Sequence, residues 1–467
     1  MYRSDVQSSS PQLWAELVLR RYAGQTNRLL AGRRFWLTAP DARGEALAAA
    51  LAAVGARVVD DDAVDAVFGA DALDAWFIDV PRSSAGERID FARAHMPIVA
   101  ELAGRLAERG LLTGRRVGIC LVLEPKTAVL ALALAAAGAQ VSVFGHPEET
   151  DVAVAAELAA RGVRVFADPD PEREPALVEQ FLDQHLHLLI DDGSRLIRAL
   201  LARPSAQREL IGAAEETTSG LRPLRALGST VTFPVVAVND AGSKLFFDNA
   251  HGTGQSCLMT ILDLLDPGRS GWGLVGRRVA VAGFGPVGEG FARHVRALGG
   301  EVVVADLDPV ARLRARFAGY ATGDLVTLAA DADLVVSATG HPHTITVEVM
   351  RAARAGAAVA VAGGVEDEVD WRAALADGAG FEPVADRVER LVFADGHAVV
   401  LLDRGGCINC TAGEGNPIEI MDLSFGVQLA AVETLLTTAL PAGVQPLPNA
   451  ADRLVCELGL SSSFGEV

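Results

Sequence analysis

Short apolar runs alternate with amphipathic or alanine-rich stretches through most of this chain. Residues 116–123 are largely apolar and predict a buried strand, and the alanine-rich stretch 127–137 predicts a helix. The alternation continues with a strand at 140–144, a helix at 152–161, and strands at 163–167 and 187–190. Strands that alternate with helices favour parallel sheets joined by crossover helices.

A second region with the same alternation begins near Gly273. It is expected to contain strands at 278–282, 301–305, 334–336 and 358–362, with a helix that ends near Leu298. The first part of the chain carries a weaker strand–helix signal at 34–38 and 45–54. The pattern therefore predicts the α/β class, with two doubly wound, Rossmann-like domains joined by hinges and an N-terminal extension.

Composition excludes several kinds of partner. A chain of 467 residues exceeds one hydrophobic core and predicts two to four domains. The formal net charge of −19 argues against nucleic acid as a partner, because phosphate binding needs clustered Lys and Arg. The N-terminus has no apolar signal segment, and apolar windows such as 127–138 are too short to span a bilayer. We therefore expect a cytoplasmic protein without a membrane partner.

The five cysteines predict neither a disulfide framework nor a metal site. They are an odd, scattered set, which is typical of a reducing compartment. Cys407 and Cys410 form a single C-x-x-C pair, and no second pair completes a zinc site.

A glycine-rich turn follows the strand predicted at 278–282. It reads Gly283, Phe284, Gly285, Pro286, Val287 and Gly288. In a dinucleotide-binding turn the first glycine permits a tight turn, the second lets backbone approach the pyrophosphate, and the third allows close packing of the helix. The next strand ends at Asp306, where a carboxylate accepts hydrogen bonds from the adenosine ribose. This arrangement predicts a binding site for NAD, which an acid at this position favours over NADP.

A lysine and a carboxylate lie four positions apart in an apolar segment. They are Lys244 and Asp248, and Asn249 follows directly. On a helix this spacing places both charged groups on one face, within reach of an ion pair. Apolar surroundings make it easier for a lysine to lose its proton and act as a base. The same spacing is also typical of an ordinary surface salt bridge.

Three motifs occur in the order found in the S-adenosylhomocysteine hydrolase family. They are Glu215-Glu216-Thr217-Thr218-Ser219-Gly220, then Val238-Asn239-Asp240 with Lys244 and Phe247-Asp248-Asn249, then the glycine turn. Shorter matches occur at 190–193, 337–340, 408–409 and 416–417. From roughly residue 92 to residue 444, the chain resembles this family.

The resemblance implies tightly bound NAD, a small nucleoside substrate and a homo-oligomer, either a dimer or a tetramer. The family oxidises the ribose 3′-hydroxyl, and the ketone acidifies the C4′ proton. Homocysteine then leaves C5′, water adds, and the ketone is reduced again. The implied catalytic residues are Lys244, Asp248 and Asn249 at the 3′-hydroxyl, Glu216 at the sugar hydroxyls, and Asp192 near C4′ and C5′. The implied cofactor-binding residues, besides the glycine turn and Asp306, are Thr217, Thr218, Ser219, Thr339, Gly363 and Asn409.

Together, the pattern and the resemblance set the expected domain boundaries. The expected domains are an N-terminal α/β extension at 1–88, a substrate or catalytic domain at 89–255 and 417–450, an NAD-binding Rossmann domain at 256–416, and a C-terminal tail at 451–467.

Several family positions carry different residues in this chain. Three family histidines are replaced by Val122, Gly364 and Asn416, a family cysteine by Thr253, and the glutamate that meets the adenine amino group by Lys126. A lysine cannot accept a hydrogen bond but suits a carbonyl or an anionic group. Loss of positioned acid–base groups typically costs ~10²–10⁴ in rate. His251, His341 and His343 are candidate replacements.

The residues implied for NAD and the 3′-hydroxyl are retained, whereas those for adenine and C5′ are changed. The leading hypothesis is an NAD-dependent enzyme that oxidises a nucleoside 3′-hydroxyl to drive chemistry at C4′ and C5′, with a substrate other than S-adenosylhomocysteine. One alternative is conventional S-adenosylhomocysteine hydrolysis with relocated acid–base groups. Another is a catalytically silent, NAD-binding regulatory paralogue.

Overall fold

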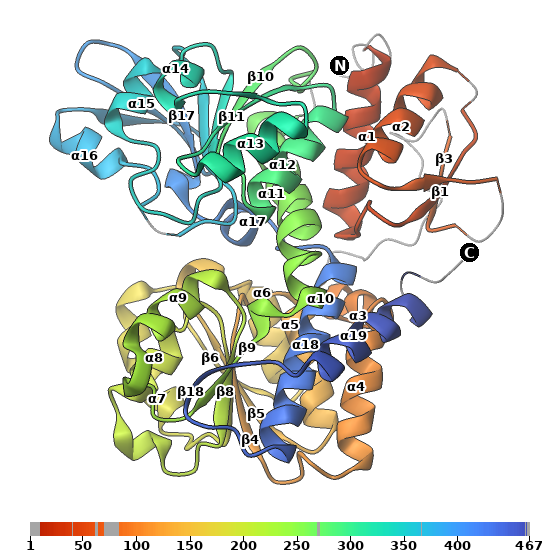
Figure 1. Cartoon of the computed structure of the whole chain (residues 1–467), viewed down its shortest axis with the longest axis vertical. Helices are drawn as coiled ribbons and strands as arrows, with labels where there is room; N and C mark the ends of the chain where they lie inside the picture. Colours follow the sequence, from red (N-terminus) through yellow and green to blue (C-terminus); the bar gives the residue numbers. More distant parts are fainter. Residues whose placement is uncertain are drawn as a thin grey trace. The chain divides into compact units, whose positions relative to one another are not determined.

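A computed structural model describes residues 10–39, 41–60, 64–69, 84–268, 271–365, 367–462 and 464. The chain forms two compact units. Unit 1 consists of Met1–Val80 and Asn249–Pro417, and unit 2 of Pro81–Asp248 and Ile418–Val467. Each unit has a β-sheet with helices on both faces, parallel throughout in unit 2 and mostly parallel in unit 1, which confirms the predicted α/β class (Figure 1).

Unit 2 is built on a seven-stranded sheet in which every neighbouring pair is parallel. The strand order is β18 (Gly443–Pro446), β9 (Pro234–Ala237), β8 (Gly212–Glu215), β7 (Leu188–Asp191), β4 (Arg116–Cys120), β5 (Gln140–Gly145) and β6 (Arg164–Ala167). The strands predicted at 116–123, 140–144, 163–167 and 187–190 are confirmed as β4, β5, β6 and β7. The first of them ends three residues early, because residues 121–123 turn away toward helix α5 (Pro125–Ala136).

Helices cover both faces of this sheet, and the central strands are therefore apolar on both sides. One face packs against α3 (Ala85–Ala94), α4 (Pro97–Glu108), α5, α6 (Val152–Ala160), α18 (Ile418–Thr437) and α19 (Asn449–Ser462). The other face packs against α7 (Glu174–Leu182), α8 (Arg195–Leu201) and α9 (Thr218–Leu227) (Figure 1).

Among the described residues, α18 is long and apolar enough to cross a membrane by length and composition. The sequence-based expectation of only short apolar windows was wrong for this helix. Its most apolar window is 78% buried inside unit 2, and Asp422 on it accepts hydrogen bonds from the backbone of Ile98 and Val99. These contacts are those of a core helix.

Unit 1 is built on an eight-stranded sheet. Its order is β12 (Ala321–Thr322), β11 (Glu301–Ala305), β10 (Arg278–Ala282), β13 (Leu334–Ser337), β14 (Ala358–Val361), β17 (Ala398–Leu402), β16 (Val388–Val392) and β15 (Gly380–Ala385). The four predicted strands are confirmed as β10, β11, β13 and β14. The last two strands in the order pair antiparallel, and they had not been predicted.

Two layers of helices enclose the unit 1 sheet. One contains α11 (Thr253–Leu265), α12 (Pro286–Ala297) and α13 (Pro309–Phe317), and the other contains α14 (Leu325–Ala329), α15 (Val347–Ala352) and α16 (Trp371–Ala376). Helix α12 begins at the glycine turn, so the strand–turn–helix order expected for dinucleotide binding is present.

The N-terminal segment packs into the same apolar core as helix α11. It contains α1 (Pro11–Thr26), β1 (Arg34–Leu37), α2 (Ala42–Ala53), β2 (Arg57–Val58) and β3 (Ala66–Phe68), so the weak signals at 34–38 and 45–54 are confirmed as β1 and α2. The buried Arg20 on α1 donates to the carbonyls of Leu262 (2.8 Å) and Asp266 (3.0 Å) at the end of α11. An arginine at a helix C-terminus satisfies carbonyls that have no partner within the helix.

Candidate active site

Polar side chains gather at the carboxyl edge of the unit 2 sheet. Cys120, Asp191, Glu215 and Ala237, the last residues of β4, β7, β8 and β9, lie in register on neighbouring strands. The residues that follow them leave the sheet at the same edge, where ligands bind in open α/β folds. Asp192 follows β7, and Glu216 follows β8.

The predicted Lys244–Asp248 ion pair is present, and it is buried. Lys244 Nζ pairs with Asp248 Oδ2 and lies 3.8 Å from Glu216 Oε1, and the three side chains are 3%, 7% and 6% exposed. Lys244 lies on the single helical turn α10 (Gly242–Leu245), and Asp248 begins the π-helix Asp248–Gly252, which also contains Asn249. The alternative of a solvated surface salt bridge is therefore wrong.

Burial and charge act in opposite directions on Lys244. Burial lowers the pKa of its ammonium, but the carboxylates of Asp248 and Glu216 raise it, and the net pKa lies above the ordinary value. The expectation that Lys244 loses its proton more easily is wrong for this arrangement, because apolar neighbours in the sequence did not reveal the carboxylates. Burial raises the pKa of Glu216 to about 7, opposed by the charge of Lys244.

Helix α18 holds Glu216 in place. The Ser424 hydroxyl donates to Glu216 Oε1, and the Gln428 side-chain amide donates to Oε2. Ser424 and Gln428 are four residues apart, so both face the same carboxylate from one side of the helix. Sequence reasoning missed both residues, because they lie more than 200 positions from Glu216 along the chain.

A third missed residue positions the helical turn that carries Lys244. Asp452 on α19 accepts hydrogen bonds from the backbone N–H groups of Gly242 (2.8 Å) and Ser243 (3.0 Å). A four-residue helix is too short to be stable alone, and a carboxylate at its N-terminus satisfies otherwise unpaired donors. Asp452, within the range 451–467 that was expected only as a tail, thus supports the site.

The chain contains only two lysines, Lys126 and Lys244, among its 41 basic residues, and both are buried in unit 2. Lys126 is 1% exposed, and its Nζ lies 2.7 Å from Glu124 Oε2. The same carboxylate accepts from the Lys126 backbone N–H (2.9 Å) and caps helix α5. A fixed ammonium and a fixed carboxylate therefore lie side by side beyond the end of β4.

Asp192 lies near charged groups of both signs, among them Glu215 and Lys244. Burial raises its pKa, and Lys244 and the Thr217 hydroxyl lower it. Thr217 is the N-cap residue of α9, and its hydroxyl donates to Glu215 Oε1 (2.8 Å) and accepts from the Gly193 backbone N–H (3.1 Å). Thr218 and Ser219, in the next two positions, are exposed.

Stability is expected to fall as the pH rises from about 6.5 to 8, above the range in which histidines with a lowered pKa, such as His294, add stability with rising pH. Burial raises the pKa of Glu16, Glu149 and Glu216 from 4.5 to about 7. The folded chain therefore holds protons that the unfolded chain has lost between these values, and this stabilisation disappears as the pH passes 7, by about 1.4 kcal/mol for each pKa unit. Thermal unfolding across this range measures it. Glu16→Gln should weaken the dependence of the melting temperature on pH. A melting temperature that rises with pH would contradict the prediction.

In unit 1, the glycine turn has the shape that the sequence predicts. Gly283 has φ +93°, and a Cβ there would lie 2.8 Å from the Ala338 carbonyl oxygen. A Cβ on Gly288 would overlap the Gly283 carbonyl oxygen, so only glycine fits. Gly285 has no atom within 4 Å of its Cβ position, which leaves room for a ligand against its backbone. Pro286 and Val287 open helix α12 behind this space. The turn therefore fits NAD.

The other predicted cofactor residues lie at carboxyl ends of strands in the same sheet. Asp306 follows β11 and accepts from the Phe284 backbone N–H (2.7 Å), which ties it to the glycine turn. Thr339 follows β13, and Gly363, with φ +62°, follows β14. These positions form one edge of the Rossmann sheet, where dinucleotides bind.

Asn409 belongs to a buried network of neutral groups that includes two of the changed family positions. Asn416 Oδ1 accepts from Asn409 Nδ2 (2.9 Å) and Ser256 Oγ (2.7 Å), and Asn416 Nδ2 donates to Thr253 Oγ1 (3.1 Å). Asn416 and Thr253, at positions where the resemblance implies a histidine and a cysteine, are thus direct partners. Their substitutions fit one another and leave a network that does not titrate near neutral pH.

Asn416→Leu is expected to weaken cofactor retention. The change leaves the amide of Asn409 and the hydroxyls of Ser256 and Thr253 without their shared partner, at a cost of ~1–3 kcal/mol for each buried group left unsatisfied. Bound NAD per chain and the melting temperature should both fall. Asn416→His, which restores the family residue, keeps a hydrogen-bonding ring and should cost less. Unchanged NAD content in the leucine variant would contradict this role.

The candidate replacement histidines lie in unit 1, mostly on its surface. His343 is 70% exposed and pairs with Asp370, and His341 is also exposed. His251 is partly buried in the π-helix, and burial lowers its pKa. Gly364 offers no room for the family histidine, because a Cβ there would overlap the side chains of Val361 and Glu368.

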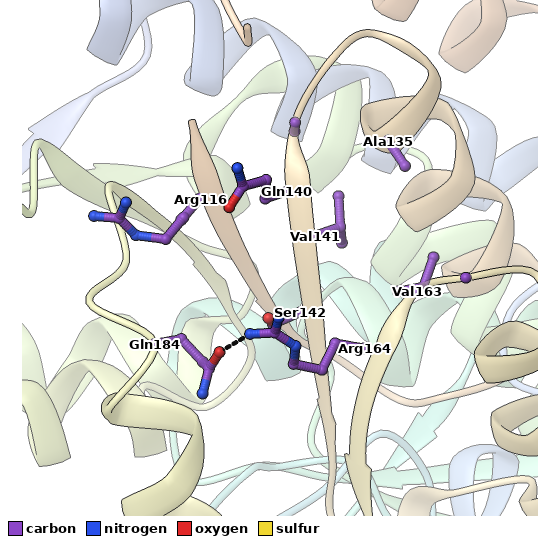
Figure 2. A pocket seen from close by; sticks show the side chains of 10 residues that line it. Arg116, Ala135, Gln140, Val141, Ser142, Val163, Arg164 and Gln184 are labelled. Carbon is purple, nitrogen blue, oxygen red and sulfur yellow. Dashed lines mark hydrogen bonds between the residues drawn. The ribbon is translucent and has the colours of Figure 1, made fainter. Parts of the chain in front are cut away.

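A cavity of about 340 Å³ lies at the opposite, amino edge of the unit 2 sheet (Figure 2). Arg116, Gln140 and Arg164, at the starts of β4, β5 and β6, contribute to its lining. Arg164 is hydrogen-bonded to Gln184, and Arg116 forms an ion pair with Glu209, so the guanidinium groups of both arginines already have partners. The cavity is separate from the polar cluster at the carboxyl edge.

A Rossmann unit with an intact dinucleotide turn, and a second unit with a buried lysine–carboxylate cluster, define an NAD-binding α/β enzyme. Residues 257–415 match the family described as S-adenosyl-L-homocysteine hydrolase, NAD binding domain. Full-length relatives extend the match over most of the chain. The protein belongs to the S-adenosylhomocysteine hydrolase family, and its cofactor is NAD.

Two relatives carry different substrate names. The S-inosyl-L-homocysteine hydrolase of Methanopyrus kandleri is 37% identical over 391 residues, which is 80% of this chain and 90% of the relative. The adenosylhomocysteinase of Thermococcus kodakarensis is 34% identical over 82% of this chain and 92% of the relative. The 3-phosphoglycerate dehydrogenase of Entamoeba histolytica is similar in structure at 11% identity, with a TM-score of 0.41 over 71% of this chain and 99% of that chain.

Proposed function

We propose that this protein is an NAD-dependent hydrolase of a purine nucleoside 5′-thioether whose base carries a 6-oxo group, that is, of S-inosyl-L-homocysteine. The buried Lys126–Glu124 pair carries this proposal. The Methanopyrus relative, whose name states the same substrate, supports it.

The Lys126–Glu124 pair distinguishes purine bases by the polarity of the hydrogen bonds that it can form. A 6-oxopurine presents a carbonyl acceptor at C6 and an N–H donor at N1, whereas adenine presents an amino donor and a bare nitrogen acceptor. Lys126 only donates, and the Glu124 carboxylate only accepts, so the pair matches the 6-oxo edge and opposes the adenine edge. A mismatch would leave a buried charged group unsatisfied, and such sites discriminate strongly.

At the sugar, Lys244 assists removal of the 3′-hydroxyl proton. A proton moves from O3′ to Lys244 as a proton of the ammonium moves to Asp248, so the lysine stays charged throughout. The glycine turn, Asp306, Thr339, Gly363, Asn409 and the 217–219 segment would hold NAD, and the bound cofactor would supply reversible hydride transfer at C3′. Glu216 and Asn249 orient the sugar hydroxyls, and Asp192 takes the C4′ proton. The C5′–S bond then breaks as a C4′–C5′ double bond forms, and the homocysteine thiolate leaves with the proton that Asp192 took from C4′. Water adds across the double bond, its oxygen to C5′ and its proton to C4′.

The alternatives have less support. Conventional S-adenosylhomocysteine hydrolysis requires an acceptor for the adenine amino group at position 126, where a lysine stands. A silent regulator has no use for three buried charges, Lys244, Asp248 and Glu216, because burial of charge is costly unless a function requires it. We place the enzyme in the cytoplasm as a homo-oligomer.

The test uses the purified protein with the NAD that it carries. Inosine and S-inosyl-L-homocysteine are added, and absorbance at the wavelength of reduced NAD and release of homocysteine are followed, with adenosine and S-adenosyl-L-homocysteine in parallel. Reduction with the inosine compounds and homocysteine release from the inosyl thioether are expected. Preferred turnover of the adenosyl compound would support conventional hydrolysis. No reduction with any nucleoside would support the silent regulator.

A further inference from the structure

Two cysteines flank the predicted cofactor residue Asn409 in unit 1. Cys407 and Cys410 form the single C-x-x-C of the chain, and both are partly exposed thiols. Cys407 directly precedes the short helix α17 (Ile408–Thr411), and Cys410 lies within it. Asn409, between them, is 3% exposed. The function proposed above uses Asn409 and gives neither cysteine a role.

The backbone brings these two cysteines close enough for a disulfide. The Cys410 N–H donates to the Cys407 carbonyl (2.8 Å), which is an i→i+3 bond of the 3-10 type. In such a turn the side chains of residues i and i+3 lie above one another. Cβ atoms three residues apart on a helix are about 5–6 Å apart, whereas a disulfide requires about 3.5–4.5 Å. A tightening of roughly 1–2 Å therefore closes the bridge.

One end of this turn is held to the sheet, and the rest carries Asn409. Cys407 forms a parallel bridge with Val361, the last residue of β14. Gly363, another predicted cofactor residue, lies two positions beyond Val361. Closing a disulfide therefore moves the 408–410 segment relative to this edge of the Rossmann sheet.

The sulfur that enters the bridge also contacts Asn409. The Cys407 thiol donates to Asn409 Oδ1 (3.4 Å), and Asn409 Nδ2 donates to Asn416 Oδ1 (2.9 Å). A disulfide sulfur carries no hydrogen, so oxidation removes the thiol donor from the amide. Oxidation of the pair therefore acts on Asn409 in two ways, by moving its backbone and by removing a hydrogen bond from its buried side chain.

The other three cysteines are poorly suited to this chemistry, because the thiolate is the reactive form of cysteine. Cys120 and Cys257 are completely buried, and burial raises the pKa of both thiols well above the ordinary value. Burial also raises the pKa of Cys456, which has no other cysteine near it in the sequence. Among the five cysteines, all of which the structure describes, the C-x-x-C pair combines access with a partner in the same turn.

We propose that Cys407 and Cys410 are a thiol–disulfide modification site whose oxidation loosens bound NAD through Asn409. The effect on NAD rests on the cofactor role proposed for Asn409. The oxidant is a low-molecular-weight disulfide. One cysteine thiolate attacks a sulfur of the oxidant, which forms a mixed disulfide and releases one thiolate. The second cysteine then attacks the first cysteine's sulfur and releases the other thiolate. The pair loses two protons and two electrons, and the oxidant gains them as two thiols.

NAD binding and oxidation of the pair must oppose each other equally. If oxidation weakens NAD binding by some factor, bound NAD makes the pair harder to oxidise by the same factor. Loss of one hydrogen bond corresponds to about three- to tenfold. A tenfold effect raises the reduction potential of the NAD-bound pair by ~30 mV. A reducing compartment therefore keeps the pair as thiols and NAD bound.

The first test maps the disulfide in the full chain carrying NAD. The protein is equilibrated in glutathione buffers of increasing oxidised fraction, the remaining thiols are alkylated, and trypsin cleaves after Arg404 and Arg453. The resulting peptide contains Cys407 and Cys410 and no other cysteine. It is expected to lose two hydrogens and both alkylation sites together. A pair that stays reduced in every buffer, or a bridge from Cys407 to Cys257, would overturn the proposal.

The second test measures NAD binding in the same buffers. The Kd for NAD should be about three- to tenfold higher in the oxidised protein, and dithiothreitol should reverse the change. Cys410→Ser cannot form the bridge but keeps the contact between Cys407 and Asn409, so its Kd should not respond to oxidation. Cys456→Ser, on α19 in unit 2, should respond like the wild type. Equal NAD affinity of oxidised and reduced wild-type protein would overturn the link to the cofactor.

A third variant separates this inference from the proposed function. Asn409→Ala should bind NAD less tightly in reducing buffer and should lose most of its response to oxidation. Unchanged NAD affinity in this variant would overturn both the cofactor role of Asn409 and its link to the thiol pair. Neither redox readout uses a nucleoside. Absence of turnover with every nucleoside would thus defeat the proposed function, and the mapped disulfide and the NAD affinities would still decide on the modification site.

Discussion

Replacement of Lys244 by methionine is expected to lower the rate of NAD reduction by a bound nucleoside about 10²–10⁴-fold. The ammonium lies between Asp248 and Glu216 in a site from which water is largely excluded. Without it, the 3′-hydroxyl proton has no carrier to Asp248, and the two carboxylates face each other without a counter-charge. Single-turnover absorbance of reduced NAD, with saturating inosine, measures the loss.

The second lysine provides the comparison for this experiment. Lys126→Met removes the other buried ammonium of unit 2. It should raise the nucleoside concentration that gives half-maximal NAD reduction, without lowering the rate of reduction at saturation. Lys244→Arg keeps the positive charge but cannot give up a proton, so it separates proton transfer from charge stabilisation. The NAD content and melting temperature of each variant establish that it is folded. Full reduction in Lys244→Met would refute the role given to this residue.

Substitution of both Glu124 and Lys126 is expected to reverse the preference for the inosyl over the adenosyl thioether. The double variant Glu124→Thr/Lys126→Glu replaces the fixed ammonium with an acceptor, which suits an amino group at C6 and repels a carbonyl. Each reversed contact to a charged group is worth ~1–3 kcal/mol, so the ratio of kcat/KM for the inosyl and adenosyl thioethers should change by about 10²-fold or more. The measurement is kcat/KM for both thioethers in the wild type and the variant.

Single substitutions control for simple damage to the site. Lys126→Met alone should lower kcat/KM for the inosyl thioether without raising kcat/KM for the adenosyl thioether, since it removes a donor and adds no acceptor. Glu124→Gln keeps the shape of the side chain and one hydrogen-bond acceptor oxygen. It should therefore lower kcat/KM less than Lys126→Met does. A wild-type enzyme that prefers the adenosyl compound, or a double variant with an unchanged ratio, would contradict recognition by this pair.

Much of the fold could be predicted because hydrophobic periodicity is a local property. Strands β10 and β11 coincide with the predicted ranges 278–282 and 301–305, since an apolar run buried on both faces has sharp limits. The antiparallel strands β15 and β16 were not predicted. Strand β15 is mostly exposed along its length, so its sequence lacks the apolar run that identified the others.

The candidate site was predictable only where its residues lie in motifs. Lys244, Asp248 and Glu216 were identified from spacing and resemblance, and they lie together. Ser424, Gln428 and Asp452, which hold Glu216 and the helical turn of Lys244, carry no local signal. A single Ser, Gln or Asp on a helix is ordinarily a surface residue, and only its contact partner reveals its use.

The sequence by itself determined the α/β class, the dinucleotide turn and the identity of the charged residues, because each of these depends on neighbours within about 30 positions. Tertiary structure decided their chemistry. It surrounded Lys244 with carboxylates that reverse the effect of burial on its pKa, and it paired Lys126 with Glu124 in the interior of unit 2. Electrostatic energy depends on distance and on exclusion of water, and both are set when strands distant in the chain are brought into register.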